Sequence, residues 1–120
     1  MRSRTREARG SVSVVAAALL MVLAVLVLAC ADATRALMAA SRAQTGADAA
    51  ALVSSSAEPP EAAASMYAQA NGGTLVGCDC ASGATEATVE VGVPAGPFLL
   101  LAGPHMVTRE ARAVVGGMSP

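Results

Sequence analysis

The sequence predicts an α+β fold, in which a single N-terminal transmembrane helix continues into a long helix and is followed by a short helix and a small antiparallel sheet. Three observations support this fold class. An uncharged run of 22 residues, Gly10 to Ala31, follows a cluster of arginines. Alanines then recur at helical spacing up to a break rich in Ser and Pro. Beyond that break, apolar and polar residues alternate with a period of two, which is typical of strands.

The uncharged run is long enough to cross a membrane once. At about 1.5 Å per residue it spans roughly 33 Å as a helix, against a hydrocarbon core of about 30 Å. Its Leu and Val residues favour insertion by about 3 to 7 kcal/mol in total. The arginines that precede it are expected to stay in the cytoplasm by the positive-inside rule; they are Arg2, Arg4, Arg6 and Arg9. We therefore expect a cytoplasmic basic tip over residues 1–10, a transmembrane helix over 11–31, and a single-pass cell-membrane protein whose C-terminal domain is extracytoplasmic.

Nothing in the sequence stops this helix between Asp32 and Ser54, so residues 32–57 are predicted to be its extracytoplasmic extension. Alanines at steps of three and four place a smooth stripe on one face; they are Ala33, Ala36, Ala40, Ala43, Ala47 and Ala50. Faces of small residues let neighbouring helices approach closely. We predict that this stripe packs against helices of partner proteins, while Arg35 and Arg42 remain solvated. An alanine-rich composition alone would give a similar spacing.

Residues 58–120 are predicted to form a small extracytoplasmic α+β domain. Pro59 and Pro60 end the long helix, because proline lacks a backbone donor and restricts the residue before it. Pro60 also suits the first position of a second helix, which we predict over 60–71 with Asn71 and the following glycines at its end. The domain has one Tyr, one Phe and no Trp. It therefore has little to bury, and its stability depends on a partner surface.

Three strands are predicted in an antiparallel sheet. The clearest covers residues 86–93, where Ala87 and the three valines alternate with polar residues and Gly92. The other two run from Thr74 to Cys80 and from Met106 to Val115. The apolar patch Phe98 to Ala102 between them is too short to cross a membrane. We expect it to plug the sheet or to touch a partner.

Enzymatic residues are not indicated. The only histidine, His105, has no neighbouring carboxylate or cysteine, and no glycine-rich phosphate loop or nucleophile elbow occurs. Glu86 and Glu90 alternate with Thr88 as on a solvated strand face. A net charge of −1 gives no footprint for nucleic acid. We expect no enzyme activity, no cofactor, no metal, no nucleic acid and no small-molecule substrate.

Cys78 and Cys80 lie two apart on a predicted strand, so their side chains should share one face with that of Val76. Three interpretations stay open. The thiols are packed in the domain, they form a disulfide, which an extracytoplasmic compartment permits but which needs local distortion, or they supply half of a zinc site.

Cys30, at the end of the predicted span, allows an alternative in which the chain is cleaved or lipidated. Val27 to Cys30 satisfies the loose form of a lipobox, and Ala29 to Ala31 loosely fits an ordinary signal cleavage site. Lipidation at Cys30, or cleavage there, would make the protein a lipid-anchored or secreted extracytoplasmic binding protein. The residues after Cys30 continue a helix instead of forming a polar tether, which favours the membrane span.

The order of these elements resembles that of TadE-like, pseudopilin-related proteins of Flp (tight-adherence) pili, specifically the short actinobacterial type found near helicase and secretion genes. The resemblance is carried by the stretches RGSVS from Arg9, RAQTGADAAAL from Arg42, and Ala70-Asn71-Gly72 leading to Leu75-Val76-Gly77-Cys78. It implies a pilin-like long helix and a minor pseudopilin or membrane-anchored assembly component. Its implied partners are the cytoplasmic membrane and other pilin-like or Tad secretion-system proteins.

The resemblance also implies processing after a glycine, as prepilin peptidases perform it. Gly10 and Ser11 would flank the cleaved bond. The glutamate usual at the fifth mature position is replaced here by Val15. Some relatives carry a cysteine in the second helix, which would pair with the strand cysteine, whereas the second helix of this chain has none.

Overall fold

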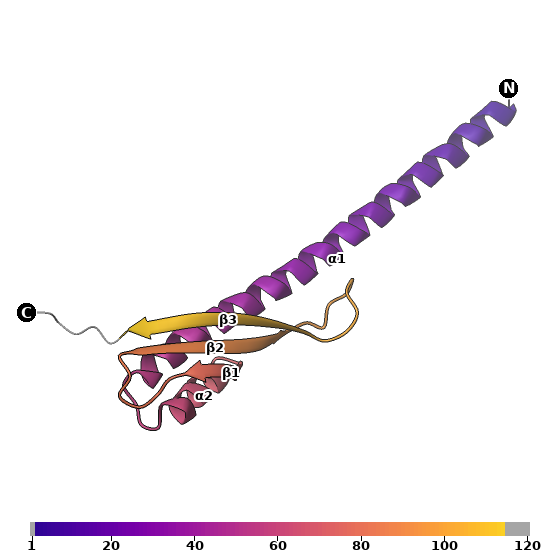
Figure 1. Cartoon of the computed structure of the whole chain (residues 1–120). Coiled ribbons are helices and arrows are strands. Elements are labelled where there is room, and N and C mark those ends of the chain that lie inside the picture. Colours follow the sequence, from indigo (N-terminus) through magenta and orange to yellow (C-terminus); the bar gives the residue numbers. More distant parts are fainter. Residues whose placement is uncertain (1, 115–120) are drawn as a thin grey trace, which may run out of the picture.

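The computed structural model describes residues 2–114, with side chains from Arg9 onward. The long helix α1 covers Arg2–Ser54 and the short helix α2 covers Pro60–Ala70 (Figure 1). Three antiparallel strands follow in the sheet order β1-β2-β3; they are β1 (Thr74–Asp79), β2 (Glu86–Ala95) and β3 (His105–Val114). The predicted α+β class is confirmed. The predicted end of the third strand at Val115 and the side chains of Arg2, Arg4 and Arg6 lie outside the described residues.

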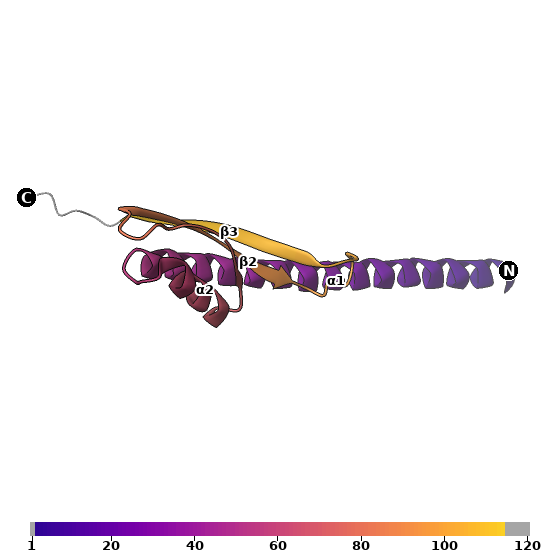
Figure 2. The ribbon, with the colours of Figure 1, turned by 60° about the horizontal axis from the view of Figure 1, so that its bottom comes forward.

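The molecule consists of a stalk and a lobe. The N-terminal half of α1 extends away from everything else, and its C-terminal half is built into the lobe (Figure 1). The sheet and α2 both pack against this half, and α2 also contacts β1 (Figure 2). The whole molecule is 92 Å long and only 32 by 17 Å across. One helix therefore serves as both the stalk and the central element of the lobe.

The alanine stripe of α1 forms the core of the lobe. Ala43, Ala47 and Ala50 are fully buried, and the main cluster joins the last two to Val89 and Val91 on the inner face of β2. The prediction that this part of the stripe packs on partner helices is therefore wrong. The inner face of the chain's own sheet is the nearest apolar surface, and methyl side chains let it approach the helix closely. Of the remaining stripe, Ala33 is exposed and Ala36 and Ala40 are half-buried.

Glycine permits the closest approach of α1 to the rest of the lobe. A Cβ atom on Gly46 would lie 3.4 Å from both Asn71 Cβ and Val91 Cγ1, which is at the short end of ordinary van der Waals contact. The end of α2 is thus held directly against α1. There the chain turns at Gly72, whose φ of +78° favours glycine, and the N–H groups of Gly72 and Gly73 donate back to the last turn of α2 in a Schellman cap.

A bulge in β1 changes which side chains face the core. The register shifts between Leu75 and Gly77, so that Leu75 and Cys78 both pack against the core cluster. Val76 is left on the outer face, where it lies against Gly92 beside Met106. The prediction that Val76 shares a face with Cys78 is therefore wrong, because the extra residue of a bulge breaks the strand alternation.

Enlarging a core alanine of α1 should destabilise the lobe. We expect Ala47→Leu to cost about 1 to 3 kcal/mol, because the added atoms have no space between α1 and β2. Ala33→Leu, at an exposed position of the same stripe, should change stability by less than about 0.5 kcal/mol. Both are measured by thermal unfolding of the full chain in detergent micelles, followed by circular dichroism. Equal stability of the two variants would contradict the packing described above.

Candidate membrane and assembly interface

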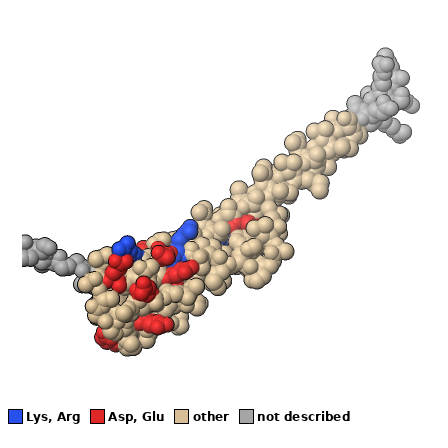
Figure 3. Space-filling model, viewed as in Figure 1, with Lys and Arg blue, Asp and Glu red and all other residues tan. Residues whose placement is uncertain are grey.

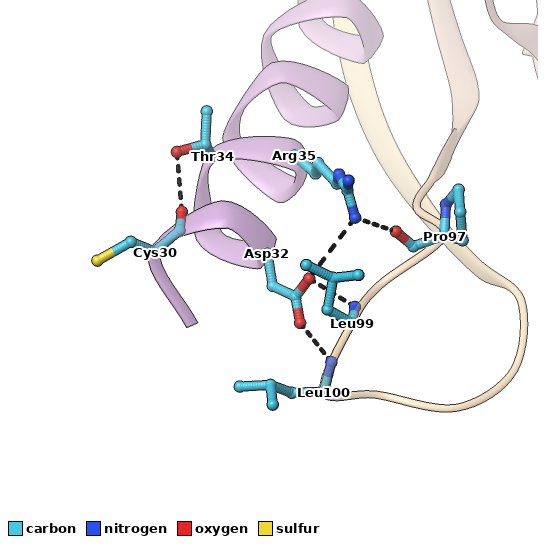
Figure 4. Close-up of polar contacts among 7 residues, drawn as sticks. All are labelled: Cys30, Asp32, Thr34, Arg35, Pro97, Leu99 and Leu100. Carbon is cyan, nitrogen blue, oxygen red and sulfur yellow. Dashed lines mark hydrogen bonds and ion pairs between the residues drawn. The ribbon is translucent and has the colours of Figure 1, made fainter. Parts of the chain in front are cut away.

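Asp32 joins α1 to the loop between β2 and β3. Its Oδ1 accepts a hydrogen bond from the backbone N–H of Leu99 at 2.7 Å, and its Oδ2 accepts one from Leu100 at 2.8 Å (Figure 4). The residue is only 8% exposed. A carboxylate that binds two successive backbone N–H groups holds the loop by its main chain, whatever the side chains there do.

Arg35, one helical turn after Asp32, completes this contact. Its guanidinium lies 3.9 Å from the Asp32 carboxylate and donates a hydrogen bond to the carbonyl oxygen of Pro97 (Figure 4). Residues three apart on a helix share a face, which brings both charges to the same loop. Arg35 and Arg42 are both exposed, as predicted, but the contacts of Arg35 with Asp32 and Pro97 were not predicted. We call Asp32, Arg35 and their partners in the loop the Asp32 clamp.

The clamp shifts the titration of its carboxylate. The N–H of Leu99 lowers the pKa of Asp32 most; burial raises it, and the Leu100 N–H and the charge of Arg35 lower it further, so the net direction is downward. A depressed pKa in the folded state means that the ionised clamp contributes stability above the ordinary pKa of an aspartate. That contribution is lost as the pH falls through the folded-state pKa.

The loop is also anchored through Phe98, whereas the leucine side chains at its tip are uncovered. Phe98 packs against the second core cluster, which contains Ala39, Ala43, Val93 and Ala95, and its ring meets that of His105 edge-on at 5.1 Å. The side chains of Leu99, Leu100 and Leu101 remain 52%, 47% and 57% exposed. Phe98 thus plugs the sheet, as expected for this patch, but the three leucines do not.

Residues 10–27 of α1 are uncharged and uncovered. Every described side chain from Arg9 to Val27 is exposed, and this helix is long and apolar enough to cross a membrane. Figure 3 shows no charge on the visible tan part of the stalk, while the charged side chains gather on the lobe. Between Arg9 and Ala31 only Leu28 and Ala31 are partly buried. Leu28, four residues before Asp32, lies on the same face of the helix as Asp32.

The three candidate processing residues all lie in the uninterrupted helix. Gly10 and Ser11 are exposed, and a Cβ on Gly10 would meet nothing within 4 Å. Cys30 is exposed as a free thiol, and its carbonyl oxygen accepts an additional hydrogen bond from Thr34 Oγ1 at 2.9 Å. The helix continues through Cys30 to Ser54 without a flexible segment.

Cys78 and Cys80 are brought together at the end of β1. Their Sγ atoms are in contact in the arrangement of a disulfide, with Cα atoms 5.3 Å apart. That Cα separation lies within the range that a disulfide spans. Cys78 also packs against the core cluster, so that the pair ties the end of the strand to the lobe. Among the described residues, no three His, Cys, Asp or Glu side chains gather in a way that could hold a metal ion.

The polar residues of the sheet are spread over its outer face. Glu86 forms a two-pronged ion pair with Arg112 at 2.6 Å, and Glu90 lies opposite Glu110 in the strand register. His105 contacts the ring of Phe98 and is exposed. The structure thus keeps the two glutamates on the face opposite the core.

Comparison with known families points to α1. Residues 10–58 match the Tad family model, whose description is "Putative Flp pilus-assembly TadE/G-like". This part of the chain is TadE/G-like. The resemblance predicted from the sequence is confirmed, and the match supports a pilus-assembly component. Neither the curated proteins nor the solved structures compared with the chain gave a match.

The TadE/G-like segment contains the predicted Gly10, Ser11 and Cys30 sites, and it also contains one feature that the sequence analysis did not predict. It covers the apolar half of α1, the alanine core and the turn before α2. The Asp32 clamp was missed, because its partners are backbone N–H groups more than sixty residues away. A usable indication was present: Asp32 is the first charge after the uncharged run.

Removing the Asp32 carboxylate should release the loop. In Asp32→Ala we expect the amides of Leu99 and Leu100 to exchange with solvent faster by on the order of tenfold, because each loses a bond to a charged acceptor. Hydrogen exchange of the full chain in micelles measures this. Asp48→Ala removes an exposed carboxylate from the same helix and should leave the loop unchanged.

The same amides should respond to pH. Protection at Leu99 and Leu100 should hold above about pH 4 and fall as the pH drops below it, since Asp32 then takes up a proton. The Asp32→Ala variant should lack this step. Protection that is independent of pH in the unsubstituted protein would show that the carboxylate does not hold the loop.

The Cys78–Cys80 pair is predicted to be oxidised in the protein isolated from membranes. Iodoacetamide added under denaturing conditions should then modify Cys30 alone, and prior reduction should expose two more thiols to it. Intact mass spectrometry counts the added groups. Modification of three cysteines without reduction would identify Cys78 and Cys80 as packed thiols instead.

Proposed function

We propose that the protein is a membrane-anchored minor pseudopilin or assembly component of a Flp (tight-adherence) pilus or a related secretion apparatus. One observation carries this proposal. Within the TadE/G-like residues, a single unbroken helix has an apolar, fully exposed first half and a second half packed into a lobe. Such a helix joins a membrane to an extracytoplasmic domain without a hinge, and that is the construction an assembling, membrane-held subunit requires.

The proposed arrangement divides the chain at residues 10, 31 and 57. Residues 1–10 are the cytoplasmic tip, 11–31 the transmembrane helix, 32–57 its extracytoplasmic extension, and 58–120 the small outer domain. Asp32, the first charge after the apolar half, falls at the outer boundary. The basic residues before Gly10 favour a cytoplasmic N-terminus by the positive-inside rule.

The partners we propose are the cytoplasmic membrane and other pilin-like or Tad secretion-system proteins. Because the sheet and α2 occupy the alanine face of α1, lateral packing in the lobe would use the opposite face. That face exposes Leu37 by 71% and Leu52 by 67%, with Ser41, Thr45 and Asp48 between them. We propose a structural role for the protein and no catalytic one.

The alternative, a lipid-anchored or secreted binding protein that begins at or near Cys30, has the exposed Cys30 thiol in its favour. It would remove the apolar half of α1 and leave Asp32 close to the new N-terminus. The uninterrupted helix on both sides of Cys30 supports the anchor instead. The two proposals differ in the mature N-terminus, which a single measurement reports.

The intact mass of the protein extracted from its native membrane tests the proposal. We expect a chain that starts at Met1, or at Ser11 after cleavage behind Gly10, with the span retained. If Ser11 is the start, a Gly10→Leu variant should accumulate at the full length, while Gly46→Ala should be processed normally. A chain that starts at a lipidated Cys30, and that stays unprocessed in Cys30→Ala, would overturn the anchor and establish a lipoprotein.

A further inference from the structure

We propose that the tip of the loop between β2 and β3, Leu99 to Leu101, is a second membrane contact that inserts into the interface of the leaflet facing the lobe. This inference rests on the proposed membrane span, and it assigns a lipid contact to residues outside that span. The loop is otherwise an unexplained feature: three consecutive leucines, each about half exposed, at the surface of a lobe that has little apolar side chain to spare.

The position of the loop along α1 is the first argument. The transmembrane segment ends at residue 31, and the clamp holds the main chain of Leu99 and Leu100 against Asp32. Side chains on a helix tilt toward its N-terminus, so the Asp32 carboxylate lies over the last turn of the span. In Figure 4, Leu100 lies below Asp32, toward the Cys30 end of the drawn helix, whereas the Cys30 side chain points away from the loop. The interface outside the hydrocarbon is about 5 to 7 Å thick, which includes this level.

The burial of the span itself gives a second argument. Among residues 9–31, only Leu28 and Ala31 lose part of their exposure. Leu28 lies on the face of α1 that carries Asp32, since it precedes Asp32 by four residues, and Ala31 lies one turn after Leu28. The leucine tip therefore continues the apolar surface of the last turn of the span, and lipid that covers one would cover the other.

The chemistry of the loop fits lipid better than a polar protein surface. No charged residue occurs between Glu90 and Arg109. Backbone N–H groups are costly in an apolar medium, but Pro97 and Pro104 have none, and those of Leu99 and Leu100 are bound by Asp32. Arg35 in turn satisfies the carbonyl of Pro97. Asp32 and Arg35 thus supply hydrogen-bond partners for these three backbone groups of the loop, which water would otherwise bind.

Tryptophan fluorescence can test this directly, because the chain contains no Trp. The variant Leu100→Trp is reconstituted in phosphatidylcholine vesicles whose acyl chains carry bromine either near the headgroup or near the chain end. Leu20→Trp, in the middle of the span and 66% exposed, reports the anchor. Leu52→Trp, 67% exposed at the far end of α1, is the control away from the membrane.

We expect headgroup-side bromine to quench Leu100→Trp more strongly than chain-end bromine, with the reverse order for Leu20→Trp and no quenching of Leu52→Trp. Adding Asp32→Ala to Leu100→Trp should weaken the lipid quenching and increase quenching by acrylamide in water. Adding Asp48→Ala should do neither.

Other results would overturn the inference. If lipid quenches Leu20→Trp but acrylamide alone quenches Leu100→Trp, the loop tip is in water. If neither quencher reaches Leu100→Trp, a protein surface covers the tip instead of lipid. If lipid fails to quench Leu20→Trp, the proposed span itself is wrong, and the inference falls with it.

Discussion

The close packing of alanine on valine determines how this chain folds. A domain with one Tyr, one Phe and no Trp cannot bury large side chains, so it gains apolar contact by bringing backbones together. The buried alanines of α1 and the glycine at position 46 let β2 and α2 approach the helix until Val89 and Val91 are fully enclosed. The helix cannot end where the membrane ends, because its second half supplies one side of the core. An unbroken α1 is therefore required by the lobe as well as by the proposed span.

Most of the secondary structure follows from local features of the sequence. Pro60 and the glycines after Asn71 delimit α2, and the alternation around Val89 and Val91 identifies β2, because both depend on neighbours in the chain. Less of the candidate site could be predicted from the sequence. The alanine spacing identified a packing face correctly, but not whether the partner was another protein or the chain itself. Likewise, the bulge near Val76 and the contacts of Asp32 arise from tertiary pairing, which the period of a single segment does not encode.

Asp32 and Arg35, the first charges after the proposed span, have a structural role in holding the loop, apart from any role of charges in setting the orientation of a membrane protein. The positive-inside rule explains the arginines before the span, but it assigns nothing to the first charges after it. Here these charges take their partners from a loop that is distant in sequence. A carboxylate that binds two adjacent backbone N–H groups places no requirement on the side chains of those residues. The leucine side chains of the loop can therefore serve contact with another surface.

The two proposed membrane attachments would have different mechanical consequences for the lobe. A single helix through a bilayer fixes the height of a domain, but it allows rotation about the helix axis and a range of tilt. A loop that meets the same leaflet beside the helix removes much of this freedom, because the clamp ties it to one face of α1. The lobe then presents the side of α1 with Leu37 and Leu52 in a defined direction along the membrane plane. In the proposed role, in which the subunit packs laterally with its neighbours, such orientation would lower the rotational entropy lost on association.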